Sequence, residues 1–323
     1  LEIESLIDNS EQIKNASFEK IGKVYGGNEL TQKYIQHIKQ SITGDLSDIK
    51  IALDCANGAT TGVAPFIFGD LEADIETIGC QPNGININDN VGSTKIETIS
   101  EFVKENNVDV GFAFDGDGDR VLAVDAKGNI VDGDKIMFIL AKHLKEQGEL
   151  KDNMVVSTVM SNIGFYKAVE ENGLQSVKTA VGDRYVVEEM RKNDYSLGGE
   201  QSGHIVLMNY ATTGDGILTA VKLANIIKTS GKSLEELASE VNIYPQKLVN
   251  IKVVDKKTAM EDAEILAECE KVEKELEGNG RILLRASGTE NLIRVMVEAS
   301  SDELTDKYCE QVAKIVREKF EIK

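Results

Sequence analysis

The sequence has little of what characterises membrane, secreted or nucleic-acid-binding proteins. No apolar run approaches the roughly 18 residues that a membrane helix needs. The four cysteines (Cys55, Cys80, Cys269 and Cys309) are far apart and form no CxxC pair, which disfavours a zinc site and a disulfide framework. Acidic residues number 55 against 36 basic ones, giving a formal net charge of −19. A chain this acidic is a poor candidate for binding nucleic acid or an anionic membrane, so we expect a cytoplasmic protein with neither partner.

What the sequence does contain is an alternation of strands and helices. Its 323 residues are enough for about two domains or three small ones. Short β-branched strands alternate with helices until about residue 240, which predicts parallel βαβ units with helices on both sheet faces. After Pro245 the pattern is typical of a small α+β module. We therefore expect an α/β protein with two βαβ-type mixed-sheet domains followed by a small α+β C-terminal domain.

The expected elements follow from hydrophobic periodicity. The predicted strands are 49–54, 74–78, 108–114, 154–158, 175–180, 248–254, 281–284 and 292–298, and the predicted helices are 31–42, 95–106, 134–146, 161–172, 182–193, 260–277 and 302–319.

Three carboxylates stand in one loop, Asp115-Gly116-Asp117-Gly118-Asp119-Arg120, which follows an apolar strand. Carboxylates this close repel one another by about 1 to 4 kcal/mol per pair, and a hard divalent cation removes that cost. The alternate glycines let Asp115, Asp117 and Asp119 converge, and all-oxygen ligands favour Mg²⁺. A solvated acidic turn is the alternative, but the carboxyl end of a strand is where α/β proteins bind ligands. An EF-hand is excluded because its sixth position needs glycine, where this chain has Arg120.

A second loop, Gly199-Glu200-Gln201-Ser202-Gly203-His204, lies between two short predicted strands. It brings together a carboxylate, an amide, a hydroxyl and an imidazole in a backbone too rich in glycine for a helix. Such a set can pair with neighbouring sugar hydroxyls, each of which donates and accepts a hydrogen bond. A tight polar hairpin without a ligand explains the composition equally well.

A third loop, Arg285-Ala286-Ser287-Gly288-Thr289-Glu290-Asn291, is followed closely by Arg294. Successive N–H groups around a glycine form a nest that binds anions, and the serine and threonine hydroxyls add donors. Arginine supplies paired hydrogen bonds to phosphate. In so acidic a chain this set predicts a phosphate site, although an ordinary β-turn with capping hydroxyls is the alternative.

A shorter motif, Gly182-Asp183-Arg184, opens a predicted helix. Its backbone amides and Arg184 could meet an anion, which makes Asp183 and Arg184 additional candidates for the site. The alternative is a plain N-terminal turn that contains an aspartate.

Together these segments resemble the α-D-phosphohexomutase superfamily, end to end and in the same order. The matching segments are DCANGA at 54–59, DGDGDR at 115–120, VGDRYV at 181–186, GEQSGH at 199–204 and RASGTEN at 285–291. Gln201 favours the glucosamine branch of the superfamily, because the phosphomannomutase/phosphoglucomutase branch typically has methionine there. In that branch the reaction interconverts glucosamine 6-phosphate and glucosamine 1-phosphate through a phosphoserine enzyme and a 1,6-bisphosphate intermediate.

The resemblance implies a role for each motif residue. It implies that Mg²⁺ is held by Asp115, Asp117 and Asp119. Arg120 would lie near the transferring phosphoryl group, with His204 close to the reacting end of a sugar whose hydroxyls contact Glu200 and Ser202. The distant phosphate would be held by Arg285, Ser287, Gly288, Thr289 and Arg294. A phosphorylated amino sugar and a sugar 1,6-bisphosphate activator are thus the implied ligands.

The sequence departs from the superfamily in two places. Many members have proline where this chain has Ala286 and Asn291. The nucleophilic serine of the superfamily lies in an Ala-Ser-His-Asn loop of the first of four domains, and no serine here is followed by His-Asn. We therefore expect a chain without its first domain, inactive alone and partnered by that domain. The expected parts are a remnant helix at 1–18, α/β domains at 19–128 and 129–243, and an α+β domain at 244–323.

Two other functions remain open from the residues alone. Asp115 could be the nucleophile of a Mg²⁺-dependent phosphatase, with Asp117 as its acid/base partner. Such enzymes carry threonine or valine where this chain has Asp119, which counts against that function. The chain could also be a phosphosugar-binding module without catalysis.

Overall fold

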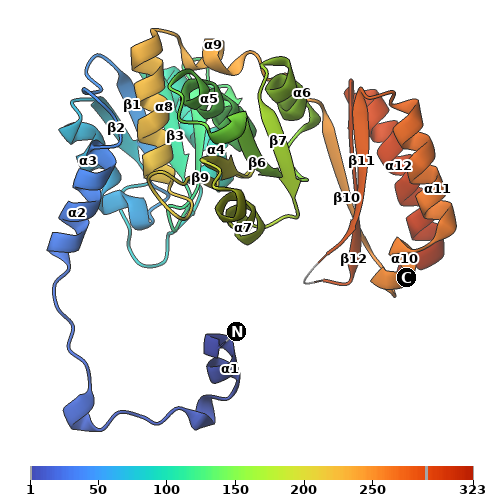
Figure 1. Cartoon of the computed structure of the whole chain (residues 1–323), viewed down its shortest axis with the longest axis horizontal. Coiled ribbons are helices and arrows are strands. Elements are labelled where there is room, and N and C mark those ends of the chain that lie inside the picture. Colours follow the sequence, from blue (N-terminus) through green and yellow to red (C-terminus); the bar gives the residue numbers. More distant parts are fainter. Residues whose placement is uncertain (1, 288–289, 323) are drawn as a thin grey trace. The chain divides into compact units, whose positions relative to one another are not determined.

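The computed structural model of the chain describes residues 2–287 and 290–322 (Figure 1). The chain divides into two compact units, Leu1–His37 and Ile38–Lys323. Nearly all of the buried core belongs to the second unit. Within the described residues no helix is both long and apolar enough to cross a membrane.

The first unit differs from the continuous helix expected at 1–18. Its α-helix α1 ends at Asp8, where the side chain of Asn9 donates a hydrogen bond to the Ser5 carbonyl at 2.8 Å. None of the α1 residues is buried, so no packing energy extends this short helix. Its helices are α1 (Glu2–Asp8), the 3₁₀ turns η1 (Ser10–Gln12) and η2 (Phe18–Lys20), and α2 (Asn28–Lys39), whose last two residues belong to the second unit.

The first sheet has five strands in the order β2-β1-β3-β4-β5. Strand β1 pairs in parallel with β2 and β3, whereas β3–β4 and β4–β5 are antiparallel, as expected for a mixed sheet. All five residues of β3 are buried, which is why this strand is a continuous apolar run. Its elements are β1 (Lys50–Asp54), η3 (Ala59–Gly62), α3 (Ala64–Asp70), β2 (Asp74–Ile78), η4 (Ser93–Lys95), α4 (Ile96–Asn106), β3 (Val110–Phe114), β4 (Val121–Asp125) and β5 (Ile130–Val131).

The second sheet has four strands in the order β7-β6-β8-β9, with β6 parallel to β7 and β8 and with β9 antiparallel to β8. Several of its helices begin at capping side chains that accept backbone N–H bonds: Asp132 for α5, Asn162 for α6 and Asp215 for α8. Its elements are α5 (Gly133–Glu146), η5 (Lys151–Asn153), β6 (Met154–Thr158), α6 (Ile163–Glu171), β7 (Gln175–Thr179), α7 (Asp183–Asn193), β8 (Leu197–Gly199), β9 (Ile205–Leu207), α8 (Gly216–Ser230) and α9 (Leu234–Ala238).

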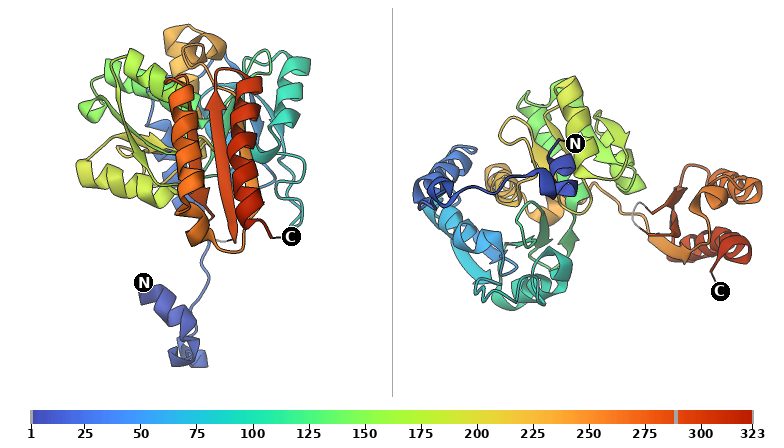
Figure 2. Two further views of the ribbon diagram at one scale, coloured as in Figure 1. Left: turned by 90° about the vertical axis from the view of Figure 1, so that its right-hand side faces the viewer. Right: turned by 90° about the horizontal axis from the view of Figure 1, so that it is seen from below.

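The C-terminal part is an antiparallel sheet in the order β10-β12-β11, with two long helices on one face (Figures 1 and 2). The helix expected at 260–277 is present but begins later, because Asp262 accepts hydrogen bonds from Glu264 N and Ile265 N and caps its start. A short helix that the sequence did not predict precedes it. Its elements are β10 (Gln246–Lys252), α10 (Lys256–Met260), α11 (Ala263–Glu275), β11 (Gly280–Ala286), β12 (Leu292–Ala299) and α12 (Asp302–Phe320). The predicted fold class is thus confirmed.

Candidate active site

The acidic loop lies at the carboxyl end of β3, as the sequence predicts. One carboxylate oxygen from each of Asp115, Asp117 and Asp119 lies within 4.8 Å of the others. Asp115 is buried, Asp119 is half-buried and Asp117 is exposed, so the group opens to solvent on one side. Three converging carboxylates supply the hard oxygen ligands that Mg²⁺ prefers, and these residues fit such an ion.

Asp115 is the most constrained of the three. Its Oδ1 accepts hydrogen bonds from Gly118 N and Arg120 N, both at 3.1 Å. Burial raises the pKa of Asp115 to about 7, and the neighbouring carboxylates of Asp119 and Asp117 add to the rise. Arg120 Nε lies 3.8 Å from Asp115 Oδ2 and 4.0 Å from Asp119 Oδ1. The loop therefore holds charge that a cation would offset.

The loop that follows β1 supports the acidic loop from beneath. Ala59 N donates to the Gly116 carbonyl at 2.9 Å. A Cβ at Gly58 would lie 2.2 Å from the same carbonyl oxygen, so only glycine permits this approach. Asp54 holds the loop by accepting from Gly92 N at 2.6 Å and from Ala56 N at 3.0 Å. The DCANGA segment thus acts as a platform for the acidic loop.

His204 joins the second loop to the acidic one. Its side chain is buried, and its Nε2 lies 3.5 Å from Asp119 Oδ2 and 4.0 Å from Asp183 Oδ2. The backbones meet as well, since Arg120 and His204 form an antiparallel bridge and Val121 N donates to Gly203 O at 3.1 Å. These contacts bring together the two loops that the sequence predicts to act on one ligand.

The second loop borders a cavity. Ser202 Oγ donates to Glu200 Oε2 at 3.4 Å, and Glu200 Oε1 accepts from Gly182 N at 3.1 Å. The cavity has a volume of about 430 Å³ and is lined by Asp132, Thr158, Met160, Val181, Glu200, Gln201 and Ser202. The lining is mostly apolar with a few polar side chains, which is usual for a small-molecule pocket, and the carboxylate, amide and hydroxyl groups can pair with a hydroxylated ligand.

Asp132 also lines this cavity, although no motif in the sequence points to it. It caps α5, and its Oδ2 accepts a hydrogen bond from Gln201 Nε2 at 3.2 Å. Next to it, Gly133 N donates to Gln201 O at 3.0 Å, and a Cβ at Gly133 would lie 2.1 Å from the Glu200 carbonyl oxygen. The sequence offers only an ordinary capping signal here, the Asp132-Gly133 pair ahead of an apolar helix.

The two neighbouring charged residues of the VGDRYV motif lie in different surroundings. Asp183 starts α7 and faces His204. Arg184 points elsewhere: its Nε lies 3.5 Å from Glu188 Oε1, and its guanidinium lies 4.8 Å from the centre of the Tyr185 ring. The structure thus brings Asp183 to the two loops and leaves Arg184 paired on the helix surface.

The third loop joins β11 to β12 and places two arginines directly opposite each other. Arg285 pairs with Arg294 in the strand register, and like charges in that position destabilise a sheet. Burial, with the charge of Arg294, lowers the pKa of Arg285. The Nε atoms of both arginines are buried and have no hydrogen-bond partner among the described residues. An anion would supply both the missing partner and the missing charge.

Ser287 of this loop is buried, and its Oγ accepts a hydrogen bond from Glu290 N at 3.3 Å. Gly288 and Thr289, predicted to bind phosphate, lie outside the described residues. Lys256, which the sequence analysis missed, donates from Nζ to the carbonyls of Ser287 at 2.8 Å and Glu290 at 3.1 Å. No motif surrounds this lysine, which lies at the start of α10.

Three family models match the chain in order. They are described as phosphoglucomutase/phosphomannomutase alpha/beta/alpha domain II, alpha/beta/alpha domain III and C-terminal domain. The matched residues are 32–128, 132–244 and 248–315.

The curated relatives decide the branch. The chain is 57% identical to the phosphoglucosamine mutase of Anoxybacillus flavithermus over 321 residues, which cover 99% of this chain and 72% of that protein. The chain belongs to the phosphoglucosamine mutase family. A second member, from Geobacillus thermodenitrificans, is 57% identical over 98% of this chain and 71% of its own length. The family assignment and its glucosamine branch are confirmed, and the family consists of phosphosugar mutases.

Solved structures confirm the fold of this mutase family member. A phosphoglucomutase/phosphomannomutase family protein from Burkholderia thailandensis has a TM-score of 0.74 at 18% identity over 90% of this chain. The Aspergillus fumigatus N-acetylphosphoglucosamine mutase, solved with GlcNAc-6P and magnesium, has a TM-score of 0.74 at 22% identity over 90% of this chain. The chain spans 64% and 65% of those two proteins, which is less than two thirds of their length.

Proposed function

We propose that this chain is the metal-, sugar- and phosphate-binding part of an enzyme that interconverts glucosamine 6-phosphate and glucosamine 1-phosphate. The observation that carries the proposal is the junction of the acidic and sugar loops, where His204 Nε2 lies 3.5 Å from Asp119 Oδ2. Because the two loops adjoin, one phosphosugar can meet Glu200 and Ser202 while its reacting end faces Asp119 and Arg120.

The reacting end requires positive charge. Asp115, Asp117 and Asp119 would hold Mg²⁺, which when bound offsets the charge of the transferring phosphoryl group. The guanidinium of Arg120 is within 4.0 Å of two of these carboxylates and is 45% exposed, so it can turn toward the phosphoryl oxygens. His204 holds its Nε2 at the same point, where a proton of the reacting sugar hydroxyl can be received or returned.

The opposite end of the substrate requires a fixed anion site. Arg285 and Arg294 supply donors that the described residues leave unpaired, and Ser287, Gly288 and Thr289 complete the proposed loop. Binding the distant phosphate orients the sugar, and orientation lowers the barrier by turning a bimolecular encounter into an intramolecular step. The same loop would hold either phosphate of a 1,6-bisphosphate as that molecule turns over in the site.

The phosphoryl carrier is the part that this sequence lacks, since no serine is followed by His-Asn. We assign the phosphoserine to a separate domain that docks on this chain, and a sugar 1,6-bisphosphate serves as activator. Ser202 and Ser287 do not replace it, because the first bonds to Glu200 within the sugar loop and the second orders the phosphate loop.

A coupled mutase assay tests the proposal. The chain would be incubated with glucosamine 6-phosphate, Mg²⁺ and a sugar 1,6-bisphosphate, with and without the separately expressed first domain of a curated relative. We expect turnover only in the presence of both parts. The matched control replaces Asp117 by Asn in this chain, which should abolish the reconstituted activity.

Other outcomes have defined meanings. Mutase turnover by the chain alone would contradict the assignment of the nucleophile to another domain. Release of inorganic phosphate by the chain alone, lost in Asp115→Asn, would favour the aspartyl phosphatase. Saturable binding of glucosamine 6-phosphate without turnover in any combination would favour a binding module.

A further inference from the structure

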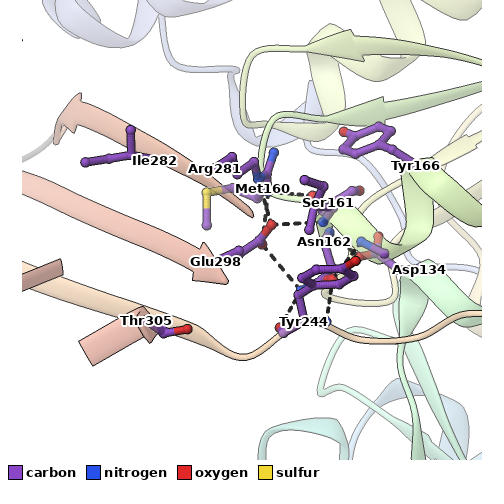
Figure 3. Close-up of polar contacts among 12 residues, drawn as sticks. Asp134, Met160, Ser161, Asn162, Tyr166, Tyr244, Arg281, Ile282, Glu298 and Thr305 are labelled. Atoms are coloured by element: carbon purple, nitrogen blue, oxygen red, sulfur yellow. Dashed lines mark hydrogen bonds and ion pairs between the residues drawn. The ribbon is translucent and has the colours of Figure 1, made fainter. Parts of the chain in front are cut away.

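A buried ion pair lies where the C-terminal sheet meets the start of α6 (Figure 3). Glu298 of β12 has a side chain with 0% exposure, and Arg281 of β11 lies directly opposite it in the strand register. Arg281 Nε donates to Glu298 Oε2 at 2.7 Å, and its Nη2 donates to Oε1 at 3.0 Å. The pair is therefore bidentate, the geometry in which an arginine and a carboxylate fix each other's orientation.

Both partners also bind the start of α6, outside the C-terminal sheet. Glu298 Oε2 accepts from Ile163 N at 2.9 Å, and Oε1 accepts from Asn162 Nδ2 at 3.4 Å. Arg281 Nη2 donates to the Ser161 carbonyl at 2.6 Å. A carboxylate at the N-terminal amides of a helix is favoured by the helix dipole, so Glu298 is held from both sides.

Asn162 extends this network to the segment that connects the two sheets. Its Oδ1 accepts from Tyr244 N and its Nδ2 donates to Tyr244 O, both at 2.9 Å. Its backbone N donates to Asp134 Oδ2 at 2.7 Å. Asn162 is fully buried, and the contacts of its amide fix the chain just ahead of β10.

Each end of the network reaches a part of the candidate site. On one side, Thr158 and Met160 line the sugar cavity just ahead of Asn162, and Asp134 follows the Asp132 that holds Gln201. On the other side, the strands that carry Arg281 and Glu298 also carry the two phosphate-site arginines, and the two pairs share one register. The hydrogen bonds of Asn162, Arg281 and Glu298 thus join a segment that lines the sugar cavity to the strands that carry the two arginines.

We propose that Arg281, Glu298 and Asn162 are positioning residues, which hold the phosphate-binding strands at the sugar cavity so that one ligand meets both at once. This inference rests on the proposed function, since it concerns a ligand with a sugar and a phosphate. A fixed spacing lets the second contact form intramolecularly, which raises affinity for the whole ligand and not for either half. Buried ion pairs contribute little net stability compared with apolar packing, which fits a role in geometry.

The test compares ligands that engage one half of the site or both. In the double variant Arg281→Met/Glu298→Met, no buried charge is left unpaired. Calorimetric titration of the full chain with glucosamine 6-phosphate should show affinity about tenfold lower or worse, while affinity for inorganic phosphate and for Mg²⁺ stays unchanged. The matched control is Lys247→Met/Asp306→Met, which removes an exposed ion pair between β10 of the same sheet and α12. This control should bind all three ligands like the wild type.

If the affinities for glucosamine 6-phosphate and for inorganic phosphate fall equally, the role of these residues is structural and the inference is overturned. Unchanged affinity for both ligands would also overturn it. A second variant, Asn162→Ala, removes the side-chain amide without adding a buried charge, and it should show the same selective loss. If the wild type binds no glucosamine 6-phosphate, the proposed function fails. The inference is then decided by small-angle scattering, where a wider spread of molecular dimensions in the double variant, absent from the control, supports it and identical curves contradict it.

Discussion

The acidic loop and the strands β11 and β12 both bring like charges together, but they hold those charges differently. In the acidic loop, the backbone amides of Gly118 and Arg120 already bind Asp115. On the strands, the Nε atoms of Arg285 and Arg294 have no partner within the described ranges. We therefore expect the acidic loop to keep its form without a cation, and the pair of arginines to depend more on a bound anion. The predictions below test that difference.

The largest effect is expected at Arg294. Arg294→Met removes one of the two opposed guanidinium groups, and hydrogen bonds to charged groups contribute about 1.5 to 3 kcal/mol each. Affinity for glucosamine 6-phosphate should fall about 100-fold, while the melting temperature in phosphate-free buffer stays the same or rises, because a like-charge pair is relieved. Calorimetry measures both, with the exposed Arg191→Met as control. A variant that melts earlier and still binds the ligand would contradict the comparison.

A smaller effect is expected in the acidic loop. Asp115→Asn removes one proposed ligand and should weaken Mg²⁺ binding at least tenfold, as losing a charged hydrogen-bonding group costs about 1.5 to 3 kcal/mol. Without Mg²⁺ the variant should melt no earlier than the wild type, because burial raises the pKa of Asp115 and makes its charge unfavourable. Titration with Mg²⁺ and thermal unfolding test this, with the exposed Asp70→Asn as control. Unchanged Mg²⁺ affinity would show that the acidic loop is not the metal site.

The acidic loop could be predicted from the sequence because its charges are contiguous and follow a buried strand. The same holds for the sugar loop, whose short strands β8 and β9 were expected. Lys256 could not be predicted, since it lies 31 residues before Ser287 and meets it only after β11 and β12 pair. The contact of Glu298 with Asn162 joins residues 136 apart and has no local signal at all.

Two predicted helices have ends that differ from those in the structure, and in each case the local surroundings of the helix end are the reason. The helix expected from residue 260 begins at Ala263, because the short side chain of Asp262 accepts hydrogen bonds from backbone amides and caps the helix there. The expected helix at the start of the chain has the right apolar residues and nothing to pack them against. Periodicity therefore located α11 but not its first residue, and the resemblance gave a helix at the start of the chain that is longer than α1.

A third prediction concerns Asp134, a buried carboxyl outside both charged groups. Burial raises its pKa well above the usual range, and the charge of Asp132 adds to the rise. Between the unfolded pKa, near 3.9, and the higher folded pKa, the folded chain binds one more proton. The free energy of unfolding therefore falls as pH rises, by about 1.4 kcal/mol per pH unit.

Asp134→Asn keeps the acceptor for Asn162 N and removes this titration. The variant should gain stability relative to the wild type as pH rises from 4 toward 7. Urea unfolding at a series of pH values measures the difference, and the exposed Asp70→Asn should run parallel to the wild type. Parallel curves for Asp134→Asn would mean that this carboxyl titrates alike in the folded and unfolded chain.

The smallest effect is expected at Lys256. Its substitution tests whether this lysine acts on the proposed phosphate loop through its hydrogen bonds or only through its charge. Its Nζ bonds to the carbonyls of Ser287 and Glu290, so Lys256→Met removes two contacts that shape the loop as well as one charge. Lys257→Met removes the same charge from the next residue of α10, which is exposed. We expect affinity for inorganic phosphate to fall about threefold to fivefold in Lys256→Met, since a hydrogen bond contributes about 0.5 to 1.5 kcal/mol net. Phosphate affinity should change less in Lys257→Met, and Mg²⁺ affinity should change in neither variant.

Equal losses in the two variants at low ionic strength, both abolished by added salt, would show that Lys256 acts only through its long-range charge. A loss confined to Lys256→Met and resistant to salt would show that the basic site, unlike the acidic loop, needs a side chain from another element to keep its form.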